Sequence, residues 1–223
     1  MTESQIIEKE RSRETETAIL EAARDLLAEG GLDALSMRAV ASKVGLSATA
    51  IYHWFQNKED LVDRVVLHGF LRSEAYMWKA IEELPAGSMD RVAALGESYI
   101  RFALENREYF KIIFAIQTPA PRNIDDVPGQ GGYRVLRQCV VEAMEAGNIR
   151  RVDADLVVLF LWSLVHGLVT IFMACDPKDL LAEAGCCSDV DEKDLTLELF
   201  DRFRAMVRMG LEPDDVRGGG SDA

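Results

Sequence analysis

Between Ser36 and Phe55 the chain carries residues of the types that contact DNA, at a spacing typical of two short helices joined by a turn. Ser36 and Ser47 suit the N-cap of a helix, because a serine hydroxyl accepts a hydrogen bond from a free backbone N–H. Gly45 lies between them, where the left-handed backbone that ends a helix is easiest for glycine. The pattern predicts a helix-turn-helix, whose second helix enters the major groove of DNA.

The second helix of this motif has an apolar face and a polar face. Ile51, Trp54 and Phe55 recur at i, i+3 and i+4 and therefore point inward together. Phenol, imidazole and hydroxyl groups on the other face can hydrogen-bond to phosphates or to base edges. The small or polar residues predicted to meet the groove are Ala48, Thr49, Tyr52, His53 and Gln56.

Charge is distributed unevenly along the chain. The formal net charge of −13 argues against a protein that binds nucleic acid over its whole surface. The window from Ser36 to Lys58 contains Arg38, Lys43 and Lys58 and no acidic residue, so it carries +3 and the remainder carries −16 (−13 minus +3). A basic patch on an acidic body fits a protein that binds DNA with one end. The same window also fits a solvated helical hairpin with ordinary surface charges.

Residues 13–70 resemble the TetR family of transcriptional regulators. The resemblance rests on ordered blocks: the helix of residues 17–31, then Leu35-Ser-Met-Arg-Ala-Val-Ala, Val44-Gly-Leu-Ser, Ile51-Tyr-His-Trp-Phe and Asn57-Lys-Glu-Asp-Leu. It implies that the positions of Ala48 and Thr49 face bases or backbone. Many members have lysine where this chain has Ala48, which leaves the operator sequence and affinity open. The resemblance further implies phosphate contacts by Ser36, Arg38, Ser47, Tyr52, His53 and Lys58.

The remaining chain shows helical periodicity and neither a strand pattern nor an internal repeat. One helix is expected to end at Gly30–Gly31, and a long helix capped by Asn57 is expected to run to Leu84, weakened or bent at Gly69. Pro- and Gly-rich residues 118–132 predict a loop, as do residues 176–189. The other predicted helices cover residues 88–105, 107–116, 133–146, 153–175 and 191–210.

The expected fold is therefore all-α, with a three-helix helix-turn-helix head joined by a long helix to a helical effector-binding and dimerisation domain. The expected domains are a disordered arm (residues 1–12), the DNA-binding head (13–60), the effector-binding and dimerisation domain (61–210) and a disordered tail (211–223).

Residues 156–175 lack Asp, Glu, Lys and Arg and are long enough to cross a bilayer. We favour a subunit interface, because Ser163, His166 and Thr170 interrupt the apolar run and no second span is present. A homodimer through helices 153–175 and 191–210 would form a four-helix interface and read a near-palindromic operator. The last helix contributes an apolar stripe to this interface: Leu195, Leu199, Phe203, Met206 and Val207.

Trp162, His166 and Gly167 resemble the Trp…His-Gly signature of one TetR C-terminal subclass, and residues 109–114 resemble an earlier block of it. This implies a dimerising domain that binds a small, largely apolar effector. Core packing is the competing interpretation for each aromatic residue, and a hydrogen-bonded core position is the competing one for His166. The residues expected to line the ligand pocket are Trp78, Phe102, Phe110, Phe114, Arg137, Met144, Trp162 and His166.

No catalytic motif, phosphate-binding glycine loop or metal-ligand spacing is present, so we expect neither an enzyme nor a cofactor. The four cysteines lack disulfide spacing and the first 17 residues lack a secretory signal, which favours the cytoplasm. A redox or metal role for Cys186 and Cys187 lacks a supporting CxxC or histidine.

The sequence thus predicts a regulator, in our interpretation a repressor released from double-stranded operator DNA by the effector, with activation left open. The alternative is a ligand-independent architectural, nucleoid-associated DNA-binding protein of the same fold. A helical adaptor without DNA binding is disfavoured, because residues 36–58 contain no acidic residue.

Overall fold

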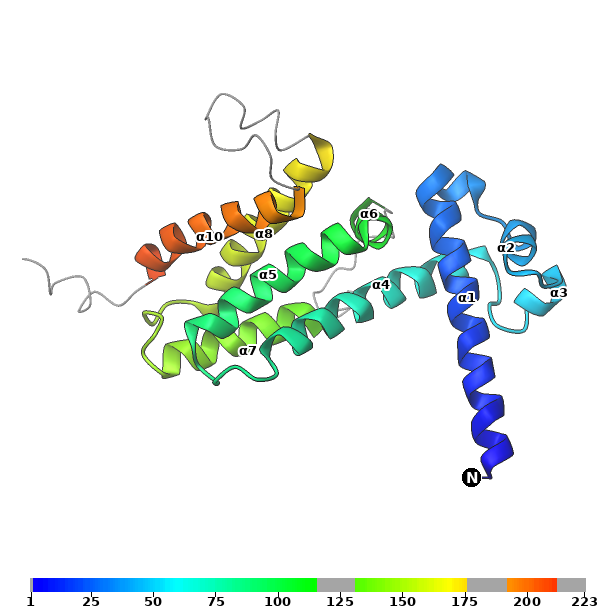
Figure 1. The fold of residues 1–223 in the computed structure, drawn as a ribbon, viewed down its shortest axis with the longest axis horizontal. Helices are drawn as coiled ribbons and strands as arrows, with labels where there is room; N and C mark the ends of the chain where they lie inside the picture. Colours follow the sequence, from blue (N-terminus) through cyan, green and yellow to red (C-terminus); the bar gives the residue numbers. More distant parts are fainter. Residues whose placement is uncertain (1, 116–130, 176–191, 212–223) are drawn as a thin grey trace, which may run out of the picture. The chain divides into compact units, whose positions relative to one another are not determined.

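The computed structural model describes residues 2–115, 131–175 and 192–211, which form nine α-helices and no strand (Figure 1). The all-α class predicted from the sequence is confirmed. The described residues belong to two compact units, and α4 contributes to both, with the division between Arg72 and Ser73. The helices are α1 (Glu3–Ala34), α2 (Met37–Val44), α3 (Ala48–Ile51), α4 (Lys58–Ile81), α5 (Met89–Glu105), α6 (Arg107–Ala115), α7 (Gly131–Glu145), α8 (Ala154–Ala174) and α10 (Glu192–Leu211).

Helix α1 begins at Glu3, so the prediction of a disordered arm over residues 1–12 is wrong for residues 3–12. The Thr2 backbone N–H donates to Gln5 Oε1 at 2.9 Å and caps this end. Residues 3–29 contain no Gly or Pro and are rich in Glu, Arg and Ala, whose high helix propensity compensates for the missing apolar face. Gly30 and Gly31 depart from helical dihedrals, as the sequence predicts, and one further turn follows.

The first unit comprises α1, α2, α3, the N-terminal part of α4, and α6. Helix α1 packs against α2 and α6, and α2 packs against α3. Side chains from four of its helices are completely buried in this unit: Ile19, Ala23, Val40, Ile51, Leu61 and Val65. The predicted boundary at residues 60 and 61 therefore differs from the structure, because residues 61–72 and α6 pack with the head.

Helix α4 begins as predicted, since Asn57 Oδ1 accepts a hydrogen bond from the Asp60 N–H at 2.8 Å. It ends at Ile81, three residues before the predicted Leu84. A Cβ atom at Gly69 would lie 2.9 Å from Ile113 Cδ1 and 3.0 Å from Tyr109 Cδ1, so this glycine lets α6 approach α4 closely.

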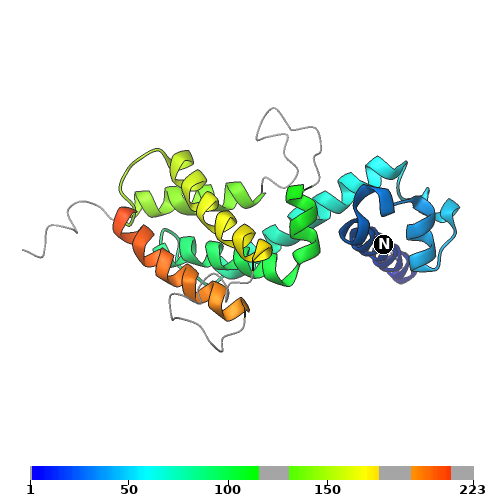
Figure 2. The same cartoon turned by 90° about the horizontal axis from the view of Figure 1, so that it is seen from above.

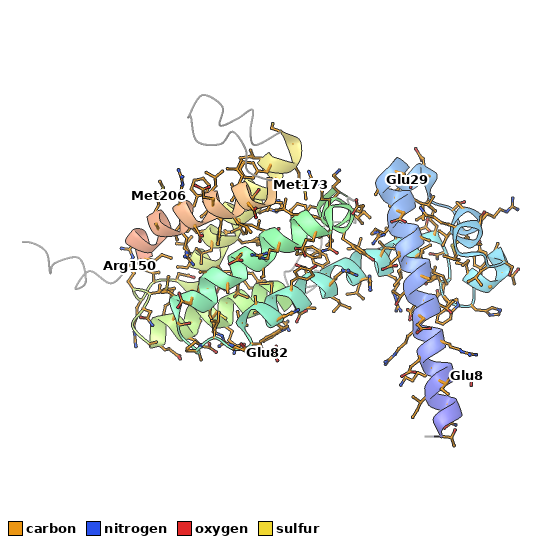
Figure 3. The ribbon with its side chains drawn as sticks, in the orientation of Figure 1. Glu8, Glu29, Glu82, Arg150, Met173 and Met206 are labelled. Atoms are coloured by element: carbon orange, nitrogen blue, oxygen red, sulfur yellow. The ribbon has the colours of Figure 1, made fainter. Side chains whose placement is uncertain are left out.

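The second unit contains the C-terminal part of α4 with α5, α7, α8 and α10. Helix α5 packs against α7, α8 and α10, and Figures 1 and 2 show α10 running beside α8. A Cβ atom at Gly96 would lie 2.6 Å from Phe200 Cζ, so α5 and α10 meet closely at this glycine. The buried core of this unit includes Ile81, Leu95, Val140, Ala143, Ile149 and Val158. Figure 3 labels Met206 on α10, whose side chain is exposed.

Four of the five later helices have bounds within a residue of those predicted, whereas α7 begins at Gly131, two residues before the predicted Tyr133. Leu211 is helical and buried, although the tail was expected to begin there. The predicted loops at 118–130 and 176–189, the tail beyond Leu211, and Cys186 and Cys187 lie outside the described residues.

Candidate nucleic-acid interface

Helices α2 and α3 are built by the capping residues that the sequence indicates. Ser36 Oγ accepts a hydrogen bond from the Ala39 N–H, and Ser47 Oγ accepts one from the Ala50 N–H, each at 3.1 Å. Gly45 has φ of 71° and its N–H donates to the Ala41 carbonyl. Each cap satisfies backbone groups that a helix end leaves free, so local chemistry alone defines both ends of the turn.

The second helix of the motif is shorter than predicted but continues as hydrogen-bonded turns. Helix α3 has four residues, after which His53 N donates to Ala50 O at 3.2 Å and Trp54 N donates to Ile51 O at 2.9 Å. The predicted inward face is confirmed, because Ile51 and Phe55 are almost completely buried and Trp54 is half-buried.

The opposite face of this segment is open to solvent. Ser47, Thr49 and His53 are exposed, and Ala48 is half-buried. The side chain of Tyr52 is 56% exposed, which is unusual for a large aromatic residue with a packing role. An exposed phenol and imidazole next to a small threonine and alanine suit contact with a polar, negatively charged surface.

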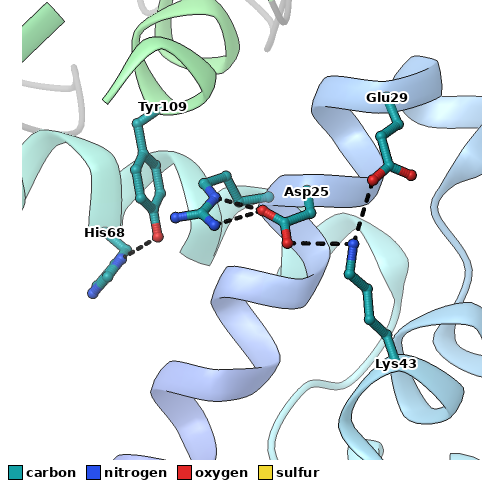
Figure 4. A network of polar contacts seen from close by, with 6 residues as sticks. Asp25, Glu29, Lys43, His68 and Tyr109 are labelled. Atoms are coloured by element: carbon teal, nitrogen blue, oxygen red, sulfur yellow. Dashed lines mark hydrogen bonds and ion pairs between the residues drawn. The ribbon is translucent and has the colours of Figure 1, made fainter. Parts of the chain in front are cut away.

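The three cations of the basic window differ in their surroundings. Arg38 is exposed and has no ion pair or hydrogen bond with any residue that the structure describes. Lys58 Nζ donates to the Leu32 carbonyl, and an ammonium group has two further N–H donors for the predicted phosphate contact. Lys43 Nζ lies 3.3 Å from Asp25 Oδ2 and 3.5 Å from Glu29 Oε1, both on α1 (Figure 4). Of the three cations, Arg38 is therefore the one without an ion-pair or hydrogen-bond partner among the described residues.

Sequence reasoning missed the ion pairs of Asp25. Arg24 donates to Asp25 Oδ1 through Nε at 2.9 Å and NH2 at 2.5 Å, while Asp25 Oδ2 pairs with Lys43. Burial alone would raise the pKa of Asp25, but the hydrogen bonds from Arg24 and Lys43 outweigh it and lower that pKa. Asp25 and Lys43 are 18 residues apart on different helices, so no periodicity marks them as partners.

The residues predicted to line a ligand pocket fall into both units. Phe110 and Phe114 belong to α6 in the first unit, where their ring centroids are 4.8 Å apart. In the second unit Phe102 and Met144 are buried, whereas Trp78 is 46% exposed.

Arg137, which the sequence suggested as a ligand contact, lies on the surface. Its Nε donates to Asp155 Oδ1 at 2.7 Å, and both side chains are about half exposed. Arg137 is therefore a half-exposed residue paired with Asp155, and its role as a ligand contact stays a prediction.

Trp162 and His166 of α8 share a polar contact with a residue that sequence reasoning overlooked. Tyr99 Oη lies 2.9 Å from His166 Nδ1 and accepts a hydrogen bond from Trp162 Nε1 at 3.5 Å. Burial strongly raises the pKa of Tyr99 and lowers that of His166, so both groups are neutral at physiological pH. The three side chains form a polar cluster between α5 and α8.

Helix α8 also has a face that nothing in the described chain covers. Leu156, Leu159, Phe160 and Ile171 are each more than half exposed, and a Cβ atom at Gly167 would meet no atom within 4 Å. The helix is long and apolar enough to cross a membrane by length and composition, but a single such helix is weak evidence because core helices pass the same test. Exposed leucine and phenylalanine in a row indicate a protein contact surface.

Comparisons with known proteins agree with both halves of this description. Residues 19–65 match the model of bacterial regulatory proteins of the tetR family, and residues 92–178 match that of the tetracyclin repressor-like C-terminal domain. The HTH-type transcriptional repressor KstR2 of Rhodococcus jostii (strain RHA1) is 35% identical over 79 residues, which are 35% of this chain and 37% of KstR2. The chain thus spans about a third of the length of the curated relatives it matches.

Solved structures extend the similarity to most of the chain. A protein of unknown function from Rhodococcus sp. RHA1 has a TM-score of 0.67 at 27% identity, covering 89% of this chain and 96% of that one. FadR of Bacillus subtilis, solved in complex with stearoyl-CoA, has a TM-score of 0.66 at 17% identity, covering 83% of this chain and 95% of FadR. At that identity the likeness to FadR concerns the fold alone.

Proposed function

Because this chain belongs to the TetR family of transcriptional regulators and is not an enzyme, we propose that it represses transcription until a small effector releases it from DNA. Regulators of this family bind DNA. KstR2 is named a repressor, which supports the sign of regulation. An architectural, ligand-independent role finds no support among the relatives. Cytoplasmic residence follows from a function exerted on the chromosome.

The observation that carries the proposal is the exposed face around α3. Thr49, Tyr52 and His53 are exposed on a segment whose other side is locked into the core by Ile51 and Phe55. We assign base or backbone contact to Ala48 and Thr49. Phosphate contact is assigned to six residues, as the sequence predicts: Ser36, Arg38, Ser47, Tyr52, His53 and Lys58.

The uncovered face of α8 supports a homodimer. Burial of apolar surface contributes about 25 cal/mol per Å², so Leu156, Phe160 and Ile171 favour association with a second copy over exposure to water. Helix α10 adds Met206, which is 64% exposed. Isologous pairing of α8 and α10 with their counterparts forms a four-helix interface, and its two-fold symmetry fits a near-palindromic operator.

The second unit supports an apolar effector with one polar group. The Tyr99–Trp162–His166 cluster offers hydrogen bonds between α5 and α8, as the few polar groups of ligand sites commonly do. FadR of Bacillus subtilis holds stearoyl-CoA in this fold, so an extended apolar ligand is compatible with the architecture. We retain Phe102, Met144, Trp162 and His166 of the second unit as lining residues, with Trp78 and Arg137 of the same unit as further candidates.

Selection of bound duplexes from fragmented genomic DNA, followed by footprinting, tests the proposal. We expect one or a few enriched sites with near two-fold symmetry, bound at least about 10³-fold more tightly than random duplex. A footprint with two half-sites about one helical turn apart would support the dimer as well. Recovery of no enriched site would contradict the function proposed here.

A saturating screen of apolar compounds then tests the effector. Binding to the folded state raises the unfolding temperature, and an effector must in addition reduce operator affinity. If no compound shifts the unfolding temperature, release by an apolar effector is wrong even when the operator is found.

A further inference from the structure

Helix α6 carries a buried tyrosine that contacts two other helices of the first unit. Tyr109 is completely buried, and its hydroxyl lies 2.8 Å from His68 Nδ1 on α4 (Figure 4). The Arg24 guanidinium of α1 lies 5.1 Å from the centre of the tyrosine ring, within the range of cation–π attraction. Helix α6 follows α5 after the single residue Asn106, so the chain leads from the second unit straight into this contact.

The contact at Tyr109 continues across α1 to the DNA-binding motif. Arg24 binds one carboxylate oxygen of Asp25, at 2.5 and 2.9 Å, and Lys43 of α2 lies 3.3 Å from the other. Asp25 therefore joins two cations through separate oxygens, and neither can shift without altering its geometry. Glu29 adds a second carboxylate 3.5 Å from Lys43.

These pairs are better placed to hold a geometry than ordinary surface pairs. The side chains of Arg24, Asp25 and Lys43 are each no more than 35% exposed. Partial burial reduces solvent screening and strengthens the attraction between the charges. Both Arg24 donors meet the same oxygen, Oδ1, which leaves Oδ2 of Asp25 for Lys43.

Lys43 belongs to the basic window, yet its ammonium group is committed to α1. The ammonium group of Lys43 forms ion pairs with two carboxylates of the first unit, those of Asp25 and Glu29. Its role is therefore to orient α2, the helix that positions the turn and α3.

We propose that Arg24, Asp25 and Lys43 are positioning residues that transmit the seating of Tyr109 on α6 to helix α2, so that α1 links α6 to the DNA-binding motif. The expected consequence is control of operator affinity, and this consequence rests on the proposed function. This connection through α1 is separate from helix α4, which joins the two units covalently.

The test compares Asp25→Asn with Glu16→Gln in the full-length protein. Asp25→Asn keeps the side-chain shape but removes the charge shared by Arg24 and Lys43. Glu16 pairs with Arg64 and likewise joins α1 to α4 in the same unit, but it does not reach α2. It is therefore a matched control for the loss of one ion pair from α1.

Amide hydrogen exchange across residues 37–46, measured without DNA, is the first readout. We expect exchange there to accelerate about tenfold in Asp25→Asn and in Arg24→Met, and to stay unchanged in Glu16→Gln. Lys43→Met should accelerate it at least as much as Asp25→Asn does, because Lys43→Met also removes the pair with Glu29. Lys43→Arg should leave exchange at the wild-type rate, because it keeps a cation beside Asp25.

Operator affinity and its salt dependence are the second readout. Asp25→Asn should weaken operator binding about tenfold with the slope of log affinity against log salt unchanged, because no phosphate contact is lost. Arg38→Ala should instead reduce that slope by about one contact. If Asp25→Asn and Glu16→Gln give the same amide exchange rates across residues 37–46, the proposal is overturned. Failure of the wild-type protein to select any DNA would refute the proposed function, while the exchange data would still decide this inference.

Discussion

The two compact units expose opposite kinds of surface. Around α3 the exposed side chains are polar, with Thr49, Tyr52 and His53 facing solvent, whereas along α8 they are apolar, with Phe160 and Ile171 facing solvent. A polar face can hydrogen-bond to a charged DNA duplex. An apolar face is stabilised when another apolar surface covers it and removes it from water. The contrast supports the two partners proposed above, DNA at the first unit and a second copy of the chain at the second.

Breaking the apolar face should have the largest effect. Phe160→Asp places a charge in the proposed dimer contact, so we expect a monomer in sedimentation velocity. Operator affinity should fall about 10²- to 10⁴-fold, because two linked half-site contacts become one. Leu71→Asp is the control, since Leu71 is exposed to a similar degree (53% against 51%) but lies on α4. A dimeric Phe160→Asp protein would refute the assignment of this face.

Removing one hydroxyl from the polar face should have the next largest effect. Tyr52→Phe should weaken operator binding about 10- to 100-fold, the range for a lost hydrogen bond to a charged group. Unfolding free energy should change by less than about 0.5 kcal/mol, because Tyr52 is mostly exposed. Tyr133→Phe removes a hydroxyl bound to Asp155 in the other unit and should leave DNA binding intact. Equal affinities of the two variants would argue against a phosphate contact by Tyr52.

A methyl group at Gly96 tests the packing of the second unit without touching the first. The added Cβ would lie 2.6 Å from Phe200 Cζ, so α5 and α10 must separate or the ring must turn. Overpacking of this kind lowers the unfolding free energy by about 1–3 kcal/mol, measurable by urea denaturation. Gly210→Ala, where no atom lies within 4 Å, is the control. An unaltered midpoint in Gly96→Ala would show that this contact is loose.

One histidine in each unit should give a smaller, pH-dependent effect. Burial lowers the pKa of His68 and of His166 below the ordinary 6.5. The unfolded chain then binds more protons than the folded one in mildly acidic solution. Their contribution to stability is therefore complete above about pH 6.5 and is lost as pH falls through the lowered folded-state pKa values. Each contributes a slope of at most about 1.4 kcal/mol per pH unit.

The measurement is the free energy of unfolding between about pH 7.5 and about pH 5.5. His68→Gln and His166→Gln should each flatten the dependence, and the double variant should flatten it further. Parallel curves for wild type and variants would mean that neither histidine is kept neutral by folding.

Local signals made most of the head predictable. Ser36, Gly45 and Ser47 act through hydrogen bonds to residues within four positions, so their pattern in the sequence carries their structural role. The same holds for the cap by Asn57 and for the inward face of Ile51 and Phe55. The N-terminal arm was mispredicted because its helicity comes from propensity and a cap, without an apolar stripe.

Contacts between distant residues were not predictable in this way. The Asp25–Lys43 pair and the Tyr99–His166 pair join different helices, and no spacing rule connects them. The partner of Arg137, Asp155, was likewise not predictable, because only the packing of α7 beside α8 brings the two side chains together. Both units thus contain polar contacts that only tertiary packing creates.

The most direct test of the central claim is the affinity of the purified protein for its selected site and for a scrambled duplex across a salt series. We expect the protein to bind the selected site more than about 10³-fold more tightly than the scrambled duplex. Its affinity should fall as salt rises, because binding displaces counterions from the phosphates. Equal affinity for the two duplexes at every salt concentration would contradict sequence-specific DNA binding by the face around α3.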